Sequence, residues 1–385
     1  MTTSPSAGPL AGVRVLELGG IGPGPFAAMM LADMGAEVIR VERAAGQPER
    51  HPVLHRGRRS IAVNLKNPAG IEAVRTIAES CDVLIEGFRP GVAERLGLGP
   101  DDLLARNPGL VYGRMTGWGQ DGPWAQAPGH DINYLSLTGG LHAIGPKDGD
   151  PVPPLNLVSD FGGGGMLLIY GVVCALISAR TTGEGQVVDA AMTDGTSLLL
   201  GMTLGFLGQQ GWTERRASNM LDGGAPYYRT YRCADGGHMA VGCVEPQFYA
   251  DMLRVLGLTG DATFAAQNAR VLWPAQHARL EEVFATRTRD EWAKLFEPSE
   301  ACTTPVLTMT EAARHPHNMA RNTFAVEEDG QIQPMPAPRF SATPTVLPER
   351  PTVTGNRTRE VLAEAGLTAE EIEALGASGA VSWTD

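Results

Sequence analysis

A histidine and two carboxylates stand in positions suited to proton transfer. His130 and Asp131 are adjacent in a long loop rich in glycine and proline, and Asp160 comes directly before Phe161 and a run of four glycines. Histidine is the commonest general base near neutral pH, and loops above a sheet often carry an enzyme's chemistry. Taken singly, each residue also has a plain explanation, as a polar surface group or a helix N-cap. The combination indicates a site that moves a proton.

The glycine run at residues 162–165 needs an explanation of its own. Each glycine costs about 1 kcal/mol relative to alanine inside a helix, so four in succession at the start of an apolar helix are unfavourable. We therefore expect some group to approach this backbone closely. A ligand oxygen bound by free N–H groups at the helix N-terminus would fit, and it would form an oxyanion site beside Asp160.

A third carboxylate, Glu245, lies between a predicted strand and Pro246. Proline is favoured at the first position of a helix, so capping is the simpler interpretation of Glu245 when it is taken alone. Metal sites are weakly supported, because His51 and His55 are not part of an HExxH pattern and the cysteines form no CxxC pair. The sequence also has no G-x-S-x-G segment, which would mark a nucleophilic serine.

Cationic residues gather in one stretch of an otherwise acidic chain. The 385 residues include 31 lysines and arginines against 43 aspartates and glutamates, and the net charge of −12 argues against general binding to nucleic acid or anionic membranes. A solvated surface loop and a phosphate clamp explain the cationic stretch equally well. Phe88 and Arg89, after a later predicted strand, would add a flat ring for an adenine and a further guanidinium. The stretch contains Arg40, Arg43, Arg50, His51, His55, Arg56, Arg58, Arg59 and Lys66.

A glycine-rich turn near the N-terminus matches a dinucleotide-binding pattern in form only. Gly22, Gly24 and Ala27 fit G-x-G-x-x-A between a predicted strand and a predicted helix. Pro23 and Pro25 lack backbone N–H groups, so the loop has few donors for a pyrophosphate. We interpret this segment as a tight turn and not as an NAD site.

The elements that must hold these side chains alternate between strand and helix in the first third of the chain. Residues 13–18 and 37–42 are rich in β-formers and flank a helical stretch at 26–34, and the alternation continues to a strand at 110–114. We predict an α/β fold whose large domain is a doubly wound, Rossmann-like parallel sheet. From residue 223 to about 321, a hairpin signal and amphipathic helices indicate a smaller α+β domain.

Two uncharged stretches, 161–179 and 195–213, approach the length of a membrane span. The four glycines of the first, and the threonine, serine and Gln-Gln pair of the second, favour buried core helices instead. The N-terminus lacks the pattern of a secretory signal, the five cysteines suit a reducing compartment, and the C-terminal residues are no peroxisomal address. These features predict a cytoplasmic protein.

Five segments together resemble one enzyme family. They are residues 115–120, 129–134, 156–164, 183–190 and 221–228. This set is similar to the α-methylacyl-CoA racemases, a branch of the family III CoA transferases, and the likeness extends over nearly the whole chain. The resemblance implies a large domain of residues 1–222 to which 322–385 return, and a small domain of residues 223–321. It also implies that two chains interlock as a homodimer.

Catalytic roles follow from the same resemblance. It implies that His130 and Asp160 are the acid/base pair of a racemase, which interconverts R and S 2-methylacyl-CoA thioesters by proton transfer through an enolate. Asp131 lies nearby, and Glu245 of the partner subunit would orient His130. The alternative is a family III CoA transferase that moves CoA between carboxylic acids through an acyl anhydride on Asp160. In that branch, histidine is unusual at the position of His130.

The resemblance further implies which residues hold CoA, and several of them belong to the cationic stretch. CoA is part of the substrate, and neither a metal nor a redox cofactor is expected. The expected partners are acyl-CoA and a second copy of the chain, with no nucleic acid and no membrane. The preferred acyl group stays open. The CoA-binding candidates are Arg43, Val63, Asn64, Leu65, Lys66, Gly87, Phe88, Arg89, Arg95, Gly129 and Tyr134.

Overall fold

The computed structural model describes residues 8–384, and the chain divides into two compact units. Among the described residues, unit 1 comprises 8–138, 155–200 and 333–384, and unit 2 comprises 139–154 and 201–332. The C-terminal segment thus has its contacts in unit 1. The predicted limits differ from these units in three places, because residues 139–154, 201–222 and 322–332 have their contacts in unit 2.

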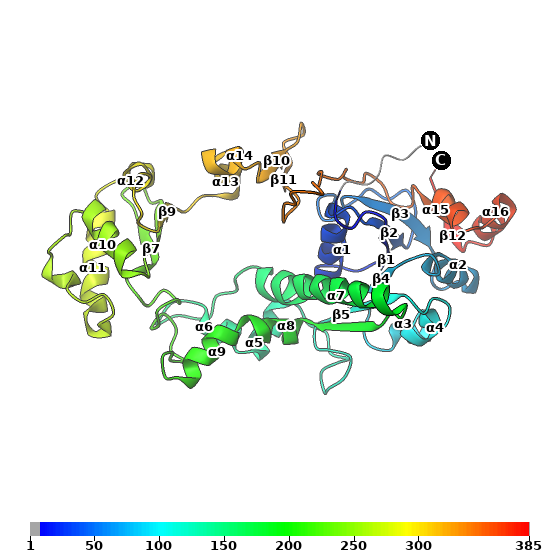
Figure 1. Cartoon of the computed structure of the whole chain (residues 1–385), viewed down its shortest axis with the longest axis horizontal. Coiled ribbons are helices and arrows are strands. Elements are labelled where there is room, and N and C mark those ends of the chain that lie inside the picture. The colour runs from blue at the N-terminus through cyan, green and yellow to red at the C-terminus, as the bar shows by residue number, and fades with distance from the viewer. Residues whose placement is uncertain (1–7, 385) are drawn as a thin grey trace. The chain divides into compact units, whose positions relative to one another are not determined.

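Unit 1 is built on one seven-stranded sheet with the order β12-β3-β2-β1-β4-β5-β6 (Figure 1). All neighbouring strands are parallel except β12, which pairs antiparallel with β3. The order changes direction between β1 and β4, so the loops that follow these two strands leave the sheet side by side at its carboxyl edge. The strands are β1 (Arg14–Leu18), β2 (Glu37–Glu42), β3 (Arg58–Val63), β4 (Val83–Glu86), β5 (Val111–Thr116), β6 (Val187–Ala191) and β12 (Val381–Ser382).

Strand β3 lies inside the stretch that the sequence analysis treats as a cationic loop. Its sequence, RRSIAV, ends in three buried residues, Ile61, Ala62 and Val63. The two arginines at its start obscure the apolar signal, so β3 was not predicted. The predicted strands at 13–18, 37–42 and 110–114 correspond to β1, β2 and β5, which confirms the doubly wound α/β class for unit 1.

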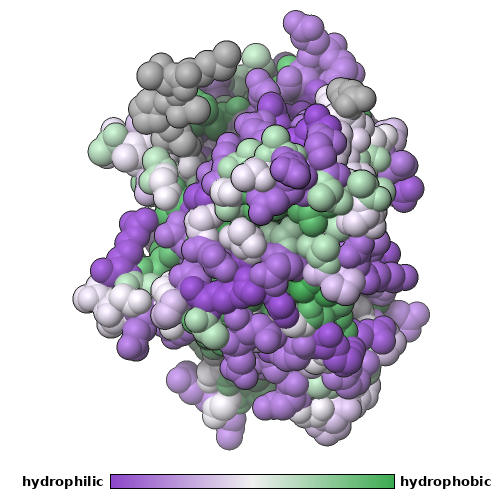
Figure 2. Space-filling view, turned by 90° about the vertical axis from the view of Figure 1, so that its right-hand side faces the viewer, coloured by the Kyte–Doolittle hydropathy of each residue, from purple (hydrophilic) through white to green (hydrophobic). Residues whose placement is uncertain are grey.

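Helices cover both faces of the sheet of unit 1 and form two separate apolar cores. One core joins the sheet to α1 and α7, through residues such as Leu31 and Leu168, and the other joins it to α2, α4, α15 and α16, through residues such as Ile77 and Val361. Where α2, α15 and α16 lie, the surface in Figure 2 is mostly hydrophilic, with smaller hydrophobic patches. The helices are α1 (Pro23–Asp33), α2 (Pro68–Ala78), α3 (Val92–Arg95), α4 (Pro100–Leu104), α5 (Asp131–Leu137), η1 (Leu157–Met166), α7 (Leu167–Thr182), α8 (Met192–Leu199), α15 (Thr358–Glu364) and α16 (Ala369–Ala377).

The helix Leu157–Thr182, in which η1 continues into α7, is by length and composition alone apolar enough to cross a membrane. One face of it packs in the core through Leu168 and Val172. Another face, with Met166, Tyr170 and Ile177, is exposed within the single chain. The prediction of a fully buried core helix was therefore wrong for this face. Helix α9 of unit 2 (Gly201–Gly208) departs further from that prediction, because it has no buried residue.

Unit 2 contains a three-stranded antiparallel sheet, β7-β8-β9, beside which three of its helices pack. The predicted hairpin is confirmed, because β7 and β8 pair across the turn at residues 233–237. Tyr231 of β7 stacks on Phe284 of α11 with ring centroids 5.0 Å apart, so the sheet and α11 share one aromatic core. The elements are α6 (Gly140–Ala143), α9, β7 (Tyr228–Arg232), β8 (His238–Gly242), α10 (Pro246–Val255), η2 (Ala262–Phe264), η3 (Arg270–Leu272), α11 (Trp273–Phe284), α12 (Arg289–Phe296), β9 (Thr303–Pro305), α13 (Met309–Arg314), α14 (Pro316–Ala320) and β10 (Phe324–Val326). Strand β11 (Ile332–Pro334) begins at the last residue of unit 2 and continues into the segment assigned to unit 1.

The C-terminal segment holds the loop that follows β3. Val381 of β12 pairs with Val63, and the backbone N–H of Asn64 donates to the carbonyl of Ala380 at 2.8 Å. The side chain of Asn67 donates to the carbonyl of Ser378 at 3.0 Å. The end of the chain thereby positions a loop that contains three of the CoA-binding candidates.

Candidate functional site

Helix α5 presents His130 and Asp131 at its first turn. His130 precedes the helix in an extended conformation, and its backbone N–H donates to the side chain of Asn133 at 3.0 Å. His130 is exposed, whereas Asp131 is 4% exposed. The two neighbours therefore face different surroundings, with the imidazole toward solvent and the carboxylate toward the interior.

The carboxylate of Asp131 binds the start of helix η1. Its Oδ2 accepts hydrogen bonds from the backbone N–H of Ser159 at 2.7 Å and of Asp160 at 2.8 Å. Charge-assisted bonds of this kind are about twice as strong as neutral ones. Asp131 therefore fixes the backbone from which the Asp160 side chain projects, which is a positioning role. These two N–H groups are also occupied and cannot bind a ligand oxygen.

Asp160 lies within a π-helical segment, η1, that begins three residues before it. It is therefore not the N-cap of the apolar helix, contrary to the simpler of the two sequence interpretations. Segments of π-helix occur frequently at functional sites. The side chain of Asn156 donates to Asp160 Oδ2 at 3.1 Å. Asn156 was not singled out from the sequence, although its spacing of four from Asp160 on a helix would have suggested the pair.

The environment of Asp160 favours its protonated form. Burial raises the pKa of Asp160 above its ordinary value and the nearby Asp131 adds to this, while the bond from Asn156 and the proximity of His130 act in the opposite direction. Gly22, at the turn before α1, borders the same carboxylate, because a Cβ atom there would lie 3.3 Å from Asp160 Oδ2. Asp160 thus lies beside the loop that follows β1, and His130 is near enough to influence its charge.

The glycine run after Asp160 is required by protein packing, which corrects the expectation of a ligand there. A Cβ atom at Gly163 would lie 2.6 Å from the Thr196 backbone N of α8, and one at Gly165 would lie 2.6 Å from the ring of Phe26 in α1. Two helices therefore make the close approach that the sequence analysis assigns to a ligand oxygen. The predicted oxyanion site has no support from the glycines.

Tyr134 and Gly129 belong to an aromatic cluster behind α5. The Tyr134 ring is 6% exposed and packs edge-on against Trp118, with centroids 4.7 Å apart. A Cβ atom at Gly117 or Gly129 would collide with this ring, at 2.1 and 2.7 Å from its Cε1. Burial, with the nearby Asp160 carboxylate, raises the pKa of Tyr134 to about 12. Tyr134 is thus a packed ring near Asp160, and its contact with CoA stays a prediction.

The remaining CoA-binding candidates lie at or near the carboxyl edge of the sheet of unit 1. Arg43 follows β2, residues 64–66 follow β3 and residues 87–89 follow β4. The cations Arg43, Lys66 and Arg89 are exposed. Ligands of open α/β sheets bind at this edge, near the point where the strand order changes direction. The fold therefore brings together candidates that are up to 46 residues apart in the sequence.

Three further candidates have distinct positions. The side chain of Val63 is 2% exposed and lies in the core, so that only its backbone could meet a ligand. Leu65 is half-buried against the same core. Arg95 of α3 is exposed, and a Cβ atom at Gly91 would lie 3.1 Å from its Nη1, so its guanidinium folds back over the start of its own helix.

A buried carboxylate that was not predicted shapes the loop after β4. Glu86 accepts from the backbone N–H of Phe88 at 2.6 Å and from Arg114 Nε at 3.0 Å. Burial raises the pKa of Glu86, and the bonds from Phe88 and Arg114 counter this only in part. The pair Glu86–Arg114 therefore sets the conformation of residues 87–88. A glutamate at the end of an otherwise apolar strand was the available signal.

The cationic stretch separates into two groups with different surroundings. Arg40 and Arg58 flank the buried carboxylate of Glu17, at 3.2 and 3.1 Å, and hold the pKa of Glu17 below its ordinary value although burial alone would raise it. Arg56 pairs with Asp33 at 2.6 Å, and Arg59 pairs with carboxylates of β2 and α15. These four arginines are structural, which contradicts a phosphate clamp made of the whole stretch. The exposed Arg43, Arg50 and Lys66 are the arginines and lysine left for a ligand.

Glu245 lies in unit 2, at the start of α10. Its side chain is exposed and makes no capping hydrogen bond, so capping does not account for it. The residues that the structure describes contain no group of three or more histidine, cysteine, aspartate or glutamate side chains arranged to hold a metal ion.

Known proteins similar to this chain support one family. The model of CoA-transferase family III matches residues 10–358. The α-methylacyl-CoA racemases of Mus musculus and Homo sapiens are 46% and 44% identical to this chain, over 94% and 95% of it and 95% and 96% of their own lengths. The crystal structure of a CAIB/BAIF family protein from Brucella suis is similar, with a TM-score of 0.80 and 28% identity over 93% of this chain and 100% of that one.

Proposed function

Because the chain belongs to CoA-transferase family III, we propose that it is an α-methylacyl-CoA racemase that acts through His130 and Asp160. The observation that supports this proposal most strongly is that helix α5 connects the two proton-transfer groups, His130 and Asp160. His130 precedes α5, and Asp131 of the same helix binds the N–H of Asp160. Racemisation needs two groups that exchange protons from opposite sides of one carbon, and this pair supplies them.

The chemistry follows from the acidity of a carbon next to a thioester. One base removes the α-proton to give a planar enolate, and the second group returns a proton to the opposite face. A raised pKa suits Asp160 for the return step, because it keeps the carboxyl group partly protonated nearer neutral pH. Asp131 keeps Asp160 in place, and Asn156 limits how far its pKa rises. We infer that these protein groups act without a metal or redox cofactor.

The CoA moiety is proposed to lie along the carboxyl edge of the sheet. Arg43, Lys66 and Arg89 are exposed there, and guanidinium and ammonium groups bind phosphate oxygens strongly. Phe88 offers a partly buried ring beside them. Asp160 borders Gly22 of the loop after β1, which leaves the sheet next to the β4 loop. A thioester could thus extend from the phosphate-binding edge to the acid/base pair.

The decisive test follows one enantiomer of a 2-methylacyl-CoA in D2O. We expect deuterium at the α-carbon and loss of optical purity without any added carboxylic acid. His130→Ala and Asp160→Asn should each lower the exchange rate by about 100-fold or more, the usual contribution of an acid/base group. The control, His317→Ala, removes an exposed histidine of α14 and should have no effect. If no deuterium enters the α-carbon and CoA moves to an added carboxylate, the protein is a CoA transferase and not a racemase.

We also propose that the active enzyme is a homodimer in which Glu245 of the partner subunit orients His130. Two features support a second copy. Glu245 is exposed and free of a capping bond, and the apolar side chains of Met166, Tyr170 and Ile177 are exposed in the single chain. Burial of this apolar face against another copy would stabilise a dimer by roughly 25 cal/mol for each Å² of apolar surface removed from water.

Co-expression of two inactive variants tests this arrangement. His130→Ala and Glu245→Ala chains that pair at random form mixed dimers, in which one site carries both changes and the other carries none. About one quarter of the wild-type activity should return, because half of the dimers are mixed and each has one intact site. If both residues of a site came from the same chain, co-expression would restore nothing. Sedimentation velocity of the wild type should show a dimer.

A further inference from the structure

A cavity of about 540 Å³ lies wholly within unit 2 and contains none of the candidate site residues. Its wall comes from the loop at residues 145–147, the loop at 217–224, strand β7 and the start of α11. Sites for small molecules are concave, usually have volumes of about 300–1,000 Å³, and often form where separate segments converge. The size and construction of this cavity are therefore those of a ligand site.

The side chains around the cavity are strongly cationic. Lys147, Arg229 and Arg270 reach it from three different segments, together with His277 of α11. The guanidinium of Arg270 lies over the ring of Trp273, 5.7 Å from its centroid. In a chain of net charge −12, three cations that converge on one cavity create a local positive field.

Arg229 is held in place by a neutral histidine. His277 Nε2 lies 2.8 Å from the carbonyl oxygen of Gly224 and must donate to it, so Nδ1 is the acceptor for Arg229 Nη1 at 2.9 Å. Burial lowers the pKa of His277, and Arg229 and Lys147 lower it further, against the bond to Gly224 and the more distant Glu281. An imidazole thus orients the guanidinium without neutralising its charge.

Two acidic groups near the cavity, Asp222 and Glu281, weaken this field without cancelling the charge of the three cations. Asp222 lines the cavity, but its two oxygens already accept from the backbone N–H groups of Ser218, Asn219 and Gly224 and from the Asn219 side chain. Glu281 stands 3.7 Å from Arg229 and is 57% exposed, so that solvent weakens this pair.

We propose that this cavity binds a small, multiply charged oxyanion, either a phosphate ester or a di- or tricarboxylate. Guanidinium groups bind both kinds of oxyanion through paired N–H···O bonds. The positioned Arg229 and the flexible Lys147 would bind the charged groups from two sides, and Trp273 would form an apolar wall. The ligand is separate from the acyl-CoA that the candidate site receives.

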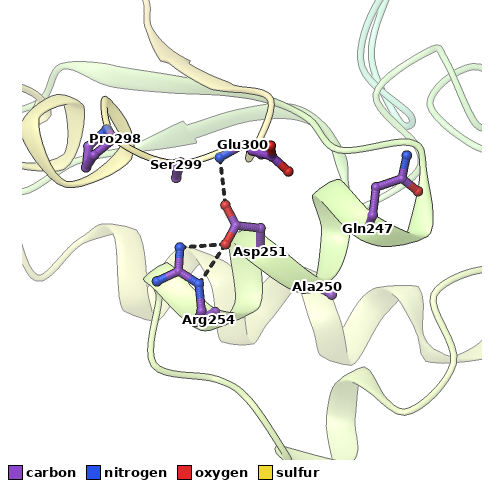
Figure 3. A pocket seen from close by; sticks show the side chains of 7 residues that line it. All are labelled: Gln247, Ala250, Asp251, Arg254, Pro298, Ser299 and Glu300. Atoms are coloured by element: carbon purple, nitrogen blue, oxygen red, sulfur yellow. Dashed lines mark hydrogen bonds and ion pairs between the residues drawn. The ribbon is translucent and has the colours of Figure 1, made fainter.

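A second cavity of unit 2, of about 520 Å³, provides a comparison for the cationic cavity (Figure 3). Its one arginine, Arg254, donates to Asp251 Oδ1 at 2.7 Å, and Asp251 Oδ2 accepts from the backbone N–H of Glu300 at 2.8 Å. The charge of Arg254 is therefore paired with Asp251, as the dashed lines of Figure 3 show. It offers an arginine of the same unit for a control substitution.

Isothermal titration calorimetry of the full-length protein with pyrophosphate and with citrate tests the proposal. Binding of either probe at constant ionic strength supports it, and the tighter probe identifies the ligand class. Arg229→Gln and Lys147→Gln should each weaken binding by about tenfold or more, the loss of one charge-assisted hydrogen bond. Arg254→Gln should change it by less than about twofold, as expected for an exposed paired charge.

Three results would overturn the proposal. The first is no heat of binding with either probe up to about 10 mM, weaker than ordinary small-molecule recognition. The second is an equal loss in Arg254→Gln and Arg229→Gln, which would mean that the probes sense only overall charge. The third is displacement of the probe by free CoA together with loss of racemisation in Arg229→Gln, which would assign the cavity to the CoA site. Circular dichroism of each variant shows that the fold is retained.

Discussion

Replacing Asp131 separates a positioning role from a catalytic one. In Asp131→Ala, the N–H groups of Ser159 and Asp160 lose their common acceptor. Each buried donor left unsatisfied costs about 1–3 kcal/mol, so we expect the free energy of unfolding to fall by about 2–6 kcal/mol. Asp131→Asn keeps an acceptor oxygen and loses only the charge assistance, so a smaller loss of about 1–3 kcal/mol is expected. The exposed Asp102→Asn is the control and should be neutral.

The two variants also differ in what they do to Asp160. The negative charge of Asp131 raises the pKa of Asp160, so the neutral amide of Asp131→Asn should lower that pKa. The acidic limb of the pH–rate profile for α-proton exchange should then move to lower pH. Urea unfolding followed by circular dichroism gives the stability change, and deuterium uptake between pH 5 and 9 gives the profile.

The reasoning about Asp131 fails on either of two results. One is an unfolding free energy of Asp131→Ala within about 0.5 kcal/mol of the wild type, the range of an ordinary surface substitution. The other is a shift of the acidic limb to higher pH in Asp131→Asn. If Asp131→Asn retained its stability but lost exchange as completely as His130→Ala, Asp131 would itself transfer the proton.

Three further predictions follow from neighbouring contacts. Arg43→Ala should raise the KM for acyl-CoA several-fold at unchanged Tm. In contrast, Arg58→Ala should lower the free energy of unfolding in urea by about 3–5 kcal/mol, because it breaks a buried ion pair and leaves Glu17 with only Arg40. Asn156→Ala removes a bond that lowers the pKa of Asp160, so the acidic limb of the exchange profile should move to higher pH. Burial lowers the pKa of His55 from 6.5 to about 4, so the unfolded chain takes up the proton first, and stability should fall as the pH drops through this window. His55→Gln should flatten that part of the stability curve, and an unchanged curve would contradict the assignment.

The sequence predicted the features that depend on local patterns. The strands β1 and β2 with α1 between them, and the hairpin of β7 and β8, were expected from β-formers, helical spacing and turn residues. The exposed cations after β2, β3 and β4 (Arg43, Lys66 and Arg89) were expected individually only from the resemblance to the enzyme family. They lie close together because parallel strands all end at one edge of the sheet. Strand β3 was not predicted, because the two arginines at its start hide its apolar pattern.

What could not be predicted depends on partners that are distant in the sequence. The sequence does not distinguish Arg43 from Arg40 and Arg58. In the structure, Arg40 and Arg58 form ion pairs with Glu17, which lies 23 and 41 residues before them. The glycine run after Asp160 is likewise explained by Thr196 of α8, more than thirty residues later. Neither the type of a residue nor its neighbours in the chain carries that information.

The strand β12 has a consequence for how the protein is made. A ribosome completes residues 139–154 and 201–332, all of unit 2, before it reaches the segment 333–385. Until Val381 and Ser382 emerge, β3 has an open edge, and the loop at residues 64–67 lacks its hydrogen bonds to the C-terminal segment. An open edge is the part of a sheet most prone to pair with another chain. Closure of this edge and ordering of the loop at residues 64–67 therefore both depend on a segment that is synthesised after all of unit 2.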